Sequence, residues 1–175
     1  GKGEMITKDQ APDRKMSSEN LDTLNALNNY ADSLDRLGQH KEAEPLKREA
    51  FAVTCQVMGR KHPNTLTALQ NYASTIDEIG QKADAEPLKK QLLEFSRAIL
   101  GPMHPDSLKA LSSYAESVVD VGKHAEAEPL KKEAMKRTKK ALGTKHPNTL
   151  DALNTYADAL SALGRHHKAE PFKKE

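Results

Sequence analysis

The sequence predicts an all-α fold built from a helix pair that repeats along the chain, and three observations support this prediction. Tyrosine, glycine and proline recur at a constant spacing of 42 residues. Within each period, apolar residues follow helical spacing. Glycine and proline also stand where helices are expected to end and to begin. The recurring residues are Tyr30, Tyr72, Tyr114 and Tyr156; Gly38, Gly80, Gly122 and Gly164; and Pro45, Pro87, Pro129 and Pro171.

The first period, residues 20–61, predicts two helices. Asn20 is a suitable N-cap for the first helix, and Gly38 is expected to end it in the left-handed conformation. The second helix is expected over 40–58, where Gly59 ends it. The apolar stripe of the first helix is Leu24, Leu27, Ala31, Leu34 and Leu37, and that of the second is Ala43, Leu46, Ala50, Val53 and Val57.

The later periods cover 62–103, 104–145 and 146–175, and the last is truncated. Each begins with His-Pro, where proline suits the first helical position and His62 or Asn64 is expected to cap the helix of the second period. The chain therefore holds about three and three-quarter repeats. Small residues are expected where two helix axes approach closely. These residues are Ala31, Ala73, Ala115 and Ala157 in the first helices, and Ala43, Ala85, Ala127 and Ala169 in the second helices.

The repeated phrase HPxTLxxLxxYAxxLxxxGxxxEAEPLKxxA resembles a tetratricopeptide repeat, in particular the 42-residue variety of kinesin light chains. The resemblance implies a right-handed α-solenoid of helix-turn-helix units. It also implies that the first helix of each pair, helix A, lines a concave groove that holds a peptide or a partner protein. The coiled-coil segment of kinesin light chains has no counterpart here. Chaperone-binding members hold a peptide C-terminus with Lys, Arg and Asn residues on successive A helices. This clamp is also missing, because Lys109 is the one helix A cation available beside the asparagines.

The resemblance implies a protein–protein interaction scaffold or a subunit of a larger complex, with groove positions that fall on the helix A surface. The candidate groove residues are Asn28, Asn29, Asp32, Gln70, Asn71, Ser74, Lys109, Ser112, Glu116, Asn154 and Asp158. They carry the differences between repeats, and so they are the candidates for recognising a partner.

Charge divides between the two helices of each pair. Ten acidic residues lie on the A helices against Arg36 and Lys109, so an acidic groove is expected to prefer a basic or amide-rich ligand. The alternative is that these faces are charged only for solubility. The second helices, the B helices, carry the compensating bases, most densely Lys131, Lys132, Lys136, Arg137, Lys139 and Lys140. Nucleic-acid or polyanion binding on this outer face is the alternative function. It is disfavoured because no aromatic residues interleave the bases.

Other chemistry finds little support in the sequence. His62, His104 and His146 belong to helices separated by a further helix, which opposes a shared metal site. Cys55 lies inside a helical pattern, and the glycines are spaced as helix stops rather than as a phosphate loop. The tyrosines are expected to pack between repeats with their hydroxyls at a wet edge. No cofactor, metal or enzymatic activity is therefore expected.

The composition also bounds the ends of the chain and its surroundings. Residues 1–18 are polar and are expected to form a flexible arm, and 19–175 form the array. No apolar run approaches the ~20 residues of a membrane span, and no signal peptide is visible. The absence of an initiating Met suggests a processed form or a fragment. The second helix of the fourth repeat is truncated, so the end of this repeat lacks a capping helix. Either the chain is expected to continue, or a partner or a second copy is expected to cover this end. A single cysteine leaves the compartment undecided; the cytoplasm is favoured over an organelle.

Overall fold

The computed structural model describes residues 18–173, with side chains described for 22–172, and within this range it forms eight α-helices and no strand. The helices are α1 (Ser18–Arg36), α2 (His40–Met58), α3 (Pro63–Ile79), α4 (Lys82–Leu100), α5 (Pro105–Asp120), α6 (His124–Leu142), α7 (Pro147–Ala162) and α8 (His166–Lys173). The all-α prediction is confirmed. The expected flexible arm lies outside the described residues, apart from Ser18.

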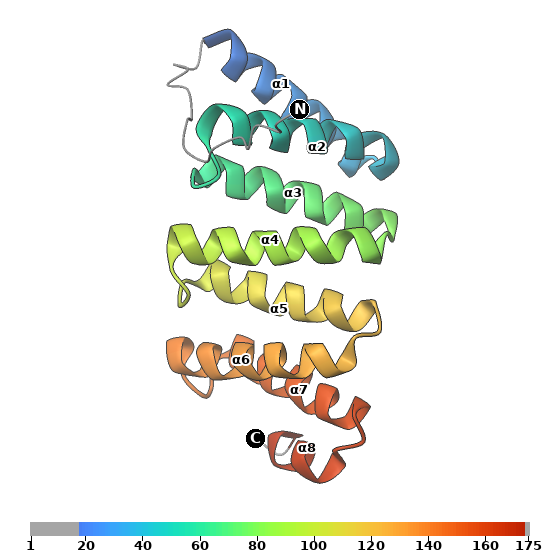
Figure 1. The fold of residues 1–175 in the computed structure, drawn as a ribbon, viewed down its shortest axis with the longest axis vertical. Helices are drawn as coiled ribbons and strands as arrows, with labels where there is room; N and C mark the ends of the chain where they lie inside the picture. Colours follow the sequence, from blue (N-terminus) through green and yellow to red (C-terminus); the bar gives the residue numbers. More distant parts are fainter. Residues whose placement is uncertain (1–17, 174–175) are drawn as a thin grey trace, which may run out of the picture.

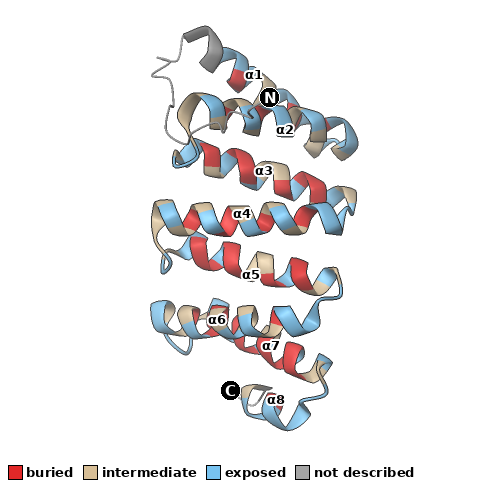
Figure 2. Cartoon of the chain, in the orientation of Figure 1, coloured by how far each residue is buried: buried red, intermediate tan, exposed pale blue. Residues whose placement is uncertain are grey.

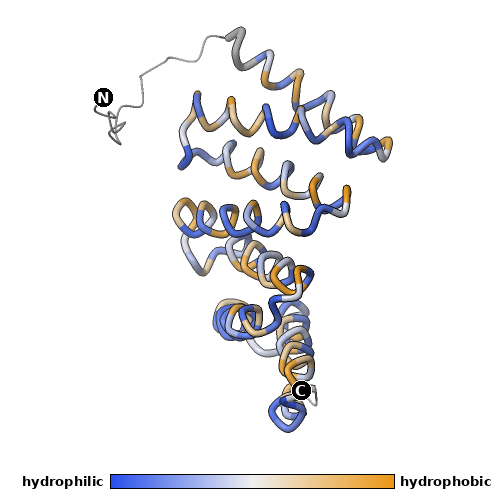
Figure 3. The backbone as a smooth tube through the Cα atoms, turned by 45° about the vertical axis from the view of Figure 1, so that its right-hand side comes forward, coloured by the Kyte–Doolittle hydropathy of each residue, from blue (hydrophilic) through white to orange (hydrophobic). Residues whose placement is uncertain are grey.

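The helices stack in chain order along the long axis of the molecule (Figure 1). The substantial interfaces among the described residues all join helices that are neighbours in sequence, such as α2 with α3 and α4 with α5. In the turned view the upper helices run across the picture, whereas α6 and α7 are seen nearly end-on, so the stack twists along its axis (Figure 3). Local contacts and a steady twist are the features of an α-solenoid.

The core is a series of thin layers between neighbouring helices (Figure 2). Leu69, Leu111 and Leu160 of the A helices are at most 1% exposed. The eight alanines predicted at close helix contacts are at most 2% exposed, which confirms that prediction. Because alanine keeps the axes close, each layer is filled without large side chains, and a chain with 4% aromatic residues can still bury a continuous core.

The helix starts show why each period opens with His-Pro. The Nδ1 atom of His62 accepts a hydrogen bond from the backbone N–H of Asn64 at 3.1 Å, so His62, and not Asn64, is the cap of α3. His104 and His146 accept the equivalent bonds at 3.2 Å in α5 and α7. Each histidine thus satisfies a helix-end donor that has no partner within the helix.

The helix ends depend on glycine, as the sequence predicted. Gly80 has φ +83° and ψ 12°, the left-handed conformation, and the N–H of Gln81 then donates to the carbonyl of Ile76 at 3.2 Å. This bond closes the end of α3 in the manner of a Schellman motif. Gly59 has φ +84° and ψ 162°, a region that is almost restricted to glycine, and it turns the chain from α2 toward α3.

Two details of the predicted helices are wrong. The first helix begins at Ser18, so Asn20 lies inside it and is not its N-cap. Leu37 is 74% exposed although it continues the apolar stripe of α1. Leu37 follows Arg36, the last residue of the helix. Its side chain therefore no longer points along the buried face that helical spacing predicts.

A threonine hydroxyl bonds to the turn before α3 and to the turn before α7. The Oγ1 of Thr65 donates to the carbonyl of Gly59 at 2.7 Å, and Thr149 donates to Gly143 at the same distance. The equivalent residue of the third repeat is Ser107, which is 1% exposed, and its hydroxyl has no hydrogen-bond partner among the described residues. The turn before α5 therefore lacks a bond that the other two turns have.

This contrast predicts opposite results for two hydroxyl deletions. Thr65→Val should lower the free energy of unfolding by about 1 kcal/mol, because it removes a made hydrogen bond. Ser107→Ala should be neutral or stabilising by up to about 1 kcal/mol, because the hydroxyl it removes is buried and unpaired. Chemical denaturation followed by circular dichroism measures both. Equal destabilisation by the two substitutions would contradict the assignment.

Candidate functional site

Three hollows follow one another on the surface of the A helices, and we call this surface the A-helix groove. Each hollow lies between two successive A helices, and the B helix between them forms its floor. The cavity volumes are about 270 Å³ between α1 and α3, about 240 Å³ between α3 and α5, and about 420 Å³ between α5 and α7. We number them first, second and third in that order.

The three hollows use equivalent positions of the repeat. The first is lined by Leu24, Asn25, Asn28 and Asp32 of α1, by Asn64, Thr67, Ala68 and Asn71 of α3, and by Thr54 of α2. The second is lined by Leu66, Thr67, Gln70, Ala73, Ser74 and Asp77 of α3, by Asp106, Lys109, Ala110 and Ser113 of α5, and by Lys89, Leu92 and Ser96 of α4. The third is lined by Pro105, Asp106, Leu108, Lys109, Ser112 and Glu116 of α5, by Asn148, Asp151, Ala152 and Thr155 of α7, and by Thr138 and Leu142 of α6.

The structure brings most of the candidate groove residues into these hollows. The residues that line a hollow are Asn28, Asp32, Gln70, Asn71, Ser74, Lys109, Ser112 and Glu116. The candidates that line none of the three hollows are Asn29, Asn154 and Asp158. Lys109 lines both the second and the third hollow, so one side chain borders two neighbouring sites.

The facing wall of each hollow was predicted only in part, because Asn71 of the first hollow and Lys109 of the second were candidates and the other facing residues were not. An A helix contributes one edge to the hollow that follows it and another edge to the hollow that precedes it. The residues on the second edge include Asn64, Asp106, Asn148, Asp151 and Thr155. Their signal was their spacing, because 64, 106 and 148 are 42 residues apart and Asp106 differs from the asparagine at the other two positions. The floor residues gave no such signal, since they lie in the predicted core stripe of a B helix.

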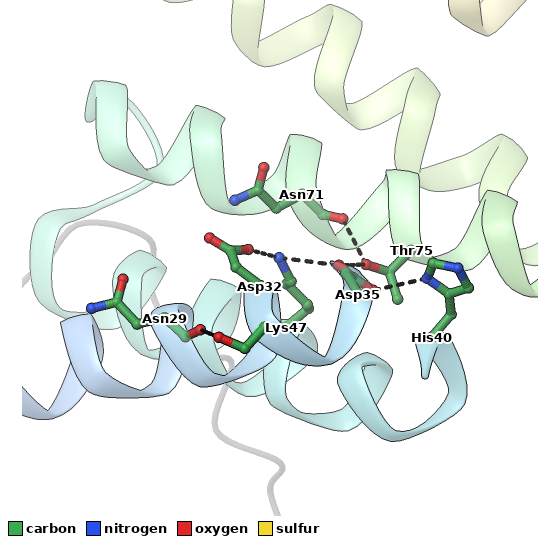
Figure 4. Close-up of polar contacts among 8 residues, drawn as sticks. Asn29, Asp32, Asp35, His40, Lys47, Asn71 and Thr75 are labelled. Carbon is green, nitrogen blue, oxygen red and sulfur yellow. Dashed lines mark hydrogen bonds and ion pairs between the residues drawn. The ribbon is translucent and has the colours of Figure 1, made fainter. Parts of the chain in front are cut away.

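A buried lysine stands behind the first hollow. Lys47 of α2 is 3% exposed, and its ammonium lies between the carboxylates of Asp32 and Asp35 of α1, with the Asp35 oxygen at 3.3 Å (Figure 4). The Thr75 hydroxyl of α3 donates to Asp35 at 2.9 Å, and the ring of His40 lies 3.0 Å from it. This network joins α1, α2 and α3, and so it links one repeat to the next.

The second repeat has a smaller version of the same arrangement. Lys89 of α4 is 8% exposed and pairs with Asp77 of α3. Lys82 lies 3.9 Å from Asp77 and 3.3 Å from Asp120, so it joins α3 to α5. Among the described residues, neither Lys47 nor Lys89 pairs with an acid of its own helix. Both side chains turn toward the preceding A helix, where a buried ammonium finds an oppositely charged partner.

The glutamate before the repeated proline contacts the tyrosine of the next repeat, and Glu44 also lies 3.7 Å from Arg48 of its own helix. Glu44 accepts a hydrogen bond from the Tyr72 hydroxyl at 3.3 Å, and Glu128 accepts one from Tyr156 at 3.2 Å. Burial first, and then the nearby carboxylate, raises the pKa of both tyrosines. The prediction of inter-repeat packing holds for these two residues. Tyr30 is 58% exposed, because no described helix precedes α1 to cover it.

The basic face of α6 is partly engaged in internal contacts. Arg137 lies 2.8 Å from Glu133, which also pairs with Arg97 of α4 at 2.9 Å. Lys132, Lys136 and Lys140 are exposed and four residues apart, so they form one row along the helix.

Among the described residues, no group of three or more His, Cys, Asp or Glu side chains is placed to hold a metal ion. None of the described helices combines the length and the apolar composition that crossing a membrane requires.

Comparisons with known proteins agree with this geometry. The family model described as tetratricopeptide repeat matches residues 22–98 and 106–175. A solved kinesin-light-chain-type protein from Podosopora anserina, with nearly identical TPR-like repeats, is similar with a TM-score of 0.73 at 24% identity, over 90% of this chain and 74% of that chain. A single-substitution variant of that protein gives a TM-score of 0.75 at 24% identity, over 90% and 73% of the two chains.

A third structure is more distant in sequence. BtubC from P. vanneervenii is similar with a TM-score of 0.73 at 14% identity, over 91% of this chain and 63% of that chain. At these identities the structural matches show the fold. A comparison of the sequence with curated proteins gave no match.

The network around Asp35 predicts a specific loss of stability in acid. Burial alone would raise the pKa of Asp35, but hydrogen bonds from His40, Thr75 and Lys47 outweigh burial and hold the pKa below its ordinary value of 3.8. The carboxylate therefore contributes stability above pH ~4, and this contribution is lost as the pH falls through the lower folded-state pKa. Asp35→Asn should lower the free energy of unfolding at pH 7 by about 1–3 kcal/mol and flatten the acid dependence below pH ~4.

The measurement is the free energy of unfolding from urea titrations between pH 2.5 and 7. Asp22→Asn is the matched control, because Asp22 is an exposed acid on the same helix. Superimposable profiles for the two variants would show that the network does not stabilise the fold.

Proposed function

The chain belongs to the tetratricopeptide repeat family, and we propose that it holds a segment of a partner protein in the A-helix groove. Such repeats generally mediate protein–protein interaction, and solenoids use extended surfaces for binding. The observation that supports the proposal is the run of three hollows built from equivalent positions. An extended segment lying across the A helices would meet the three hollows in turn.

The hollows offer a partner different chemistry along the groove. The first is rich in amides, with Asn25, Asn28, Asn64 and Asn71 on its two walls. The second and the third contain Lys109 and Asp106, and the third adds Glu116 and Asp151. Asparagine side chains both donate and accept, so the first hollow suits a peptide backbone. The acids of the third hollow suit a positively charged residue.

The function proposed is binding and not catalysis, as is typical of a repeat scaffold. Cys55, the one thiol of the chain, is half-buried in α2, and burial raises its pKa. A raised pKa opposes the thiolate form that a nucleophile needs. The groove residues instead provide many separate hydrogen-bonding groups over a long surface. We propose that the chain acts as a scaffold or complex subunit, with its specificity set by the groove.

An inserted arginine should block the groove without unfolding the chain. Ser112 lies on the wall of the third hollow, and Ser112→Arg would fill space that a ligand needs. Peptides selected on the wild-type chain from a displayed random library should bind this variant at least tenfold more weakly, as measured by fluorescence anisotropy. The selected peptides should also be enriched in basic and amide side chains.

Gln56→Arg is the matched control, because Gln56 is exposed on α2 and lines none of the three hollows. It adds the same charge and should leave peptide affinity unchanged. Circular dichroism of both variants is the check that they fold. Selected peptides that bind the Ser112→Arg variant as well as the wild type would show that the groove is not the docking surface.

A further inference from the structure

The third hollow differs from the other two in its unpaired acids. In the first two repeats an aspartate of the A helix is held by a buried lysine, as in the pairs of Asp35 with Lys47 and Asp77 with Lys89. Lys131 is the equivalent lysine of α6, and it makes no ion pair among the described residues. The reason lies in the sequence, because Val119 occupies the position of Asp35 and Asp77.

Two carboxylates stand on opposite walls of this hollow. Glu116 projects from α5 and Asp151 from α7, both side chains are exposed, and neither makes an ion pair or hydrogen bond within the part of the chain that the structure describes. Asp106 adds a third acid on the α5 wall, 3.6 Å from the imidazole of His104. Against these three acids stands one base, Lys109, so the hollow has a net negative charge.

The floor of the third hollow supplies a second and independent observation. Thr138 of α6 is 4% exposed and lines the hollow. At the equivalent positions, Thr54 donates to the carbonyl of Ala50 at 2.6 Å and Ser96 donates to that of Leu92 at 2.7 Å. Thr138 makes no such bond among the described residues. A ligand group in the hollow could supply a partner for this hydroxyl.

We propose that the third hollow binds an arginine side chain of the docked partner segment. The inference rests on the proposed function and assigns the residue class that this hollow recognises. The walls carry carboxylates on two sides, and a guanidinium presents five N–H donors in a planar fork that pairs with carboxylates in two directions. The Thr138 hydroxyl can accept one further N–H. The compact ammonium of lysine offers three donors from a single point and fits two separated walls less well.

The apolar part of the hollow suits the stem of the same side chain. Leu108 and Ala152 are 5% and 7% exposed on the two walls, and Leu142 contributes to the floor. Arginine places its methylene stem on apolar surface and its charged head among polar groups. The third hollow is also the largest of the three, at about 420 Å³, within the range of roughly 300–1,000 Å³ found for ligand pockets.

The test uses small probe peptides on the whole chain. Acetyl-Gly-Arg-Gly-amide is titrated into the isotope-labelled protein, and backbone amide shifts are followed by NMR. We expect saturable shifts at residues that line the third hollow. The matched peptide with citrulline, which keeps the shape and loses the charge, should bind at least tenfold more weakly, and so should the peptide with glutamate.

Variants of the chain distinguish binding in the third hollow from a non-specific electrostatic attraction to the acidic surface. The double substitution Glu116→Gln and Asp151→Asn should lower the affinity for the arginine peptide at least tenfold. Lys109→Gln should raise this affinity. Glu78→Gln removes one exposed acid of an A helix outside the three hollows, and it should leave the affinity for the arginine peptide unchanged. All variants keep side chains of similar size on solvent-exposed positions, and their spectra report directly whether they fold.

Three results would overturn the inference. Equal binding of the citrulline probe would show that charge is not recognised, and equal binding of a matched peptide with lysine in place of arginine would remove the preference for arginine. An unchanged affinity in the double variant would place the probe elsewhere. If the inference fails while library-selected peptides still bind the groove, the proposed function stands. If selected peptides also ignore the groove, the proposed function fails with it.

Discussion

The close approach of neighbouring helices at alanine is the constraint on which the structure depends. Ala31, Ala43, Ala73 and Ala85 are almost fully buried, so the axes of the first four helices can approach to about 8–10 Å. At this separation the layer between two helices is thin enough for a lysine stem to cross it. Lys47 does so, and its ammonium reaches the A helix carboxylates on the far side. Close packing of small residues thus permits the polar links between helices.

The fold could be predicted from the sequence because its signals are local. A helix stripe, a His-Pro start and a glycine end each lie within a few residues, and the 42-residue period repeats them in phase. The capping histidines and the buried alanines were predicted for this reason. The burial of Lys47 was not, because its partner Asp32 lies on another helix and the residue type usually marks a solvated face. Periodicity also identified one wall of each hollow, but of the facing walls, which come from the next repeat, it identified only Asn71 and Lys109.

The repeats are alike in backbone and differ in how they use their charges. In the first two repeats an acid is committed to a buried lysine, so its charge supports packing. In the third repeat Val119 replaces that acid, and the packing of the layer needs no ion pair. A buried ion pair contributes little net stability compared with an apolar contact of similar size. Lys131 keeps no acid partner among the described residues, but it is only half-buried and can stay hydrated, so the replacement has a small expected cost for the fold.

A solenoid separates stability from recognition in this way. Its stability is a sum of repeat terms and nearest-neighbour interfaces, so one repeat can lose an internal contact while its neighbours keep the array folded. A carboxylate already paired with a lysine has little attraction left for a ligand, whereas an unpaired one keeps most of it. The positions that depart from the period are therefore the ones most suited to recognition. In this chain Val119 departs from the aspartate of the first two repeats, and Glu116 and Asp151 of the third hollow make no ion pair among the described residues.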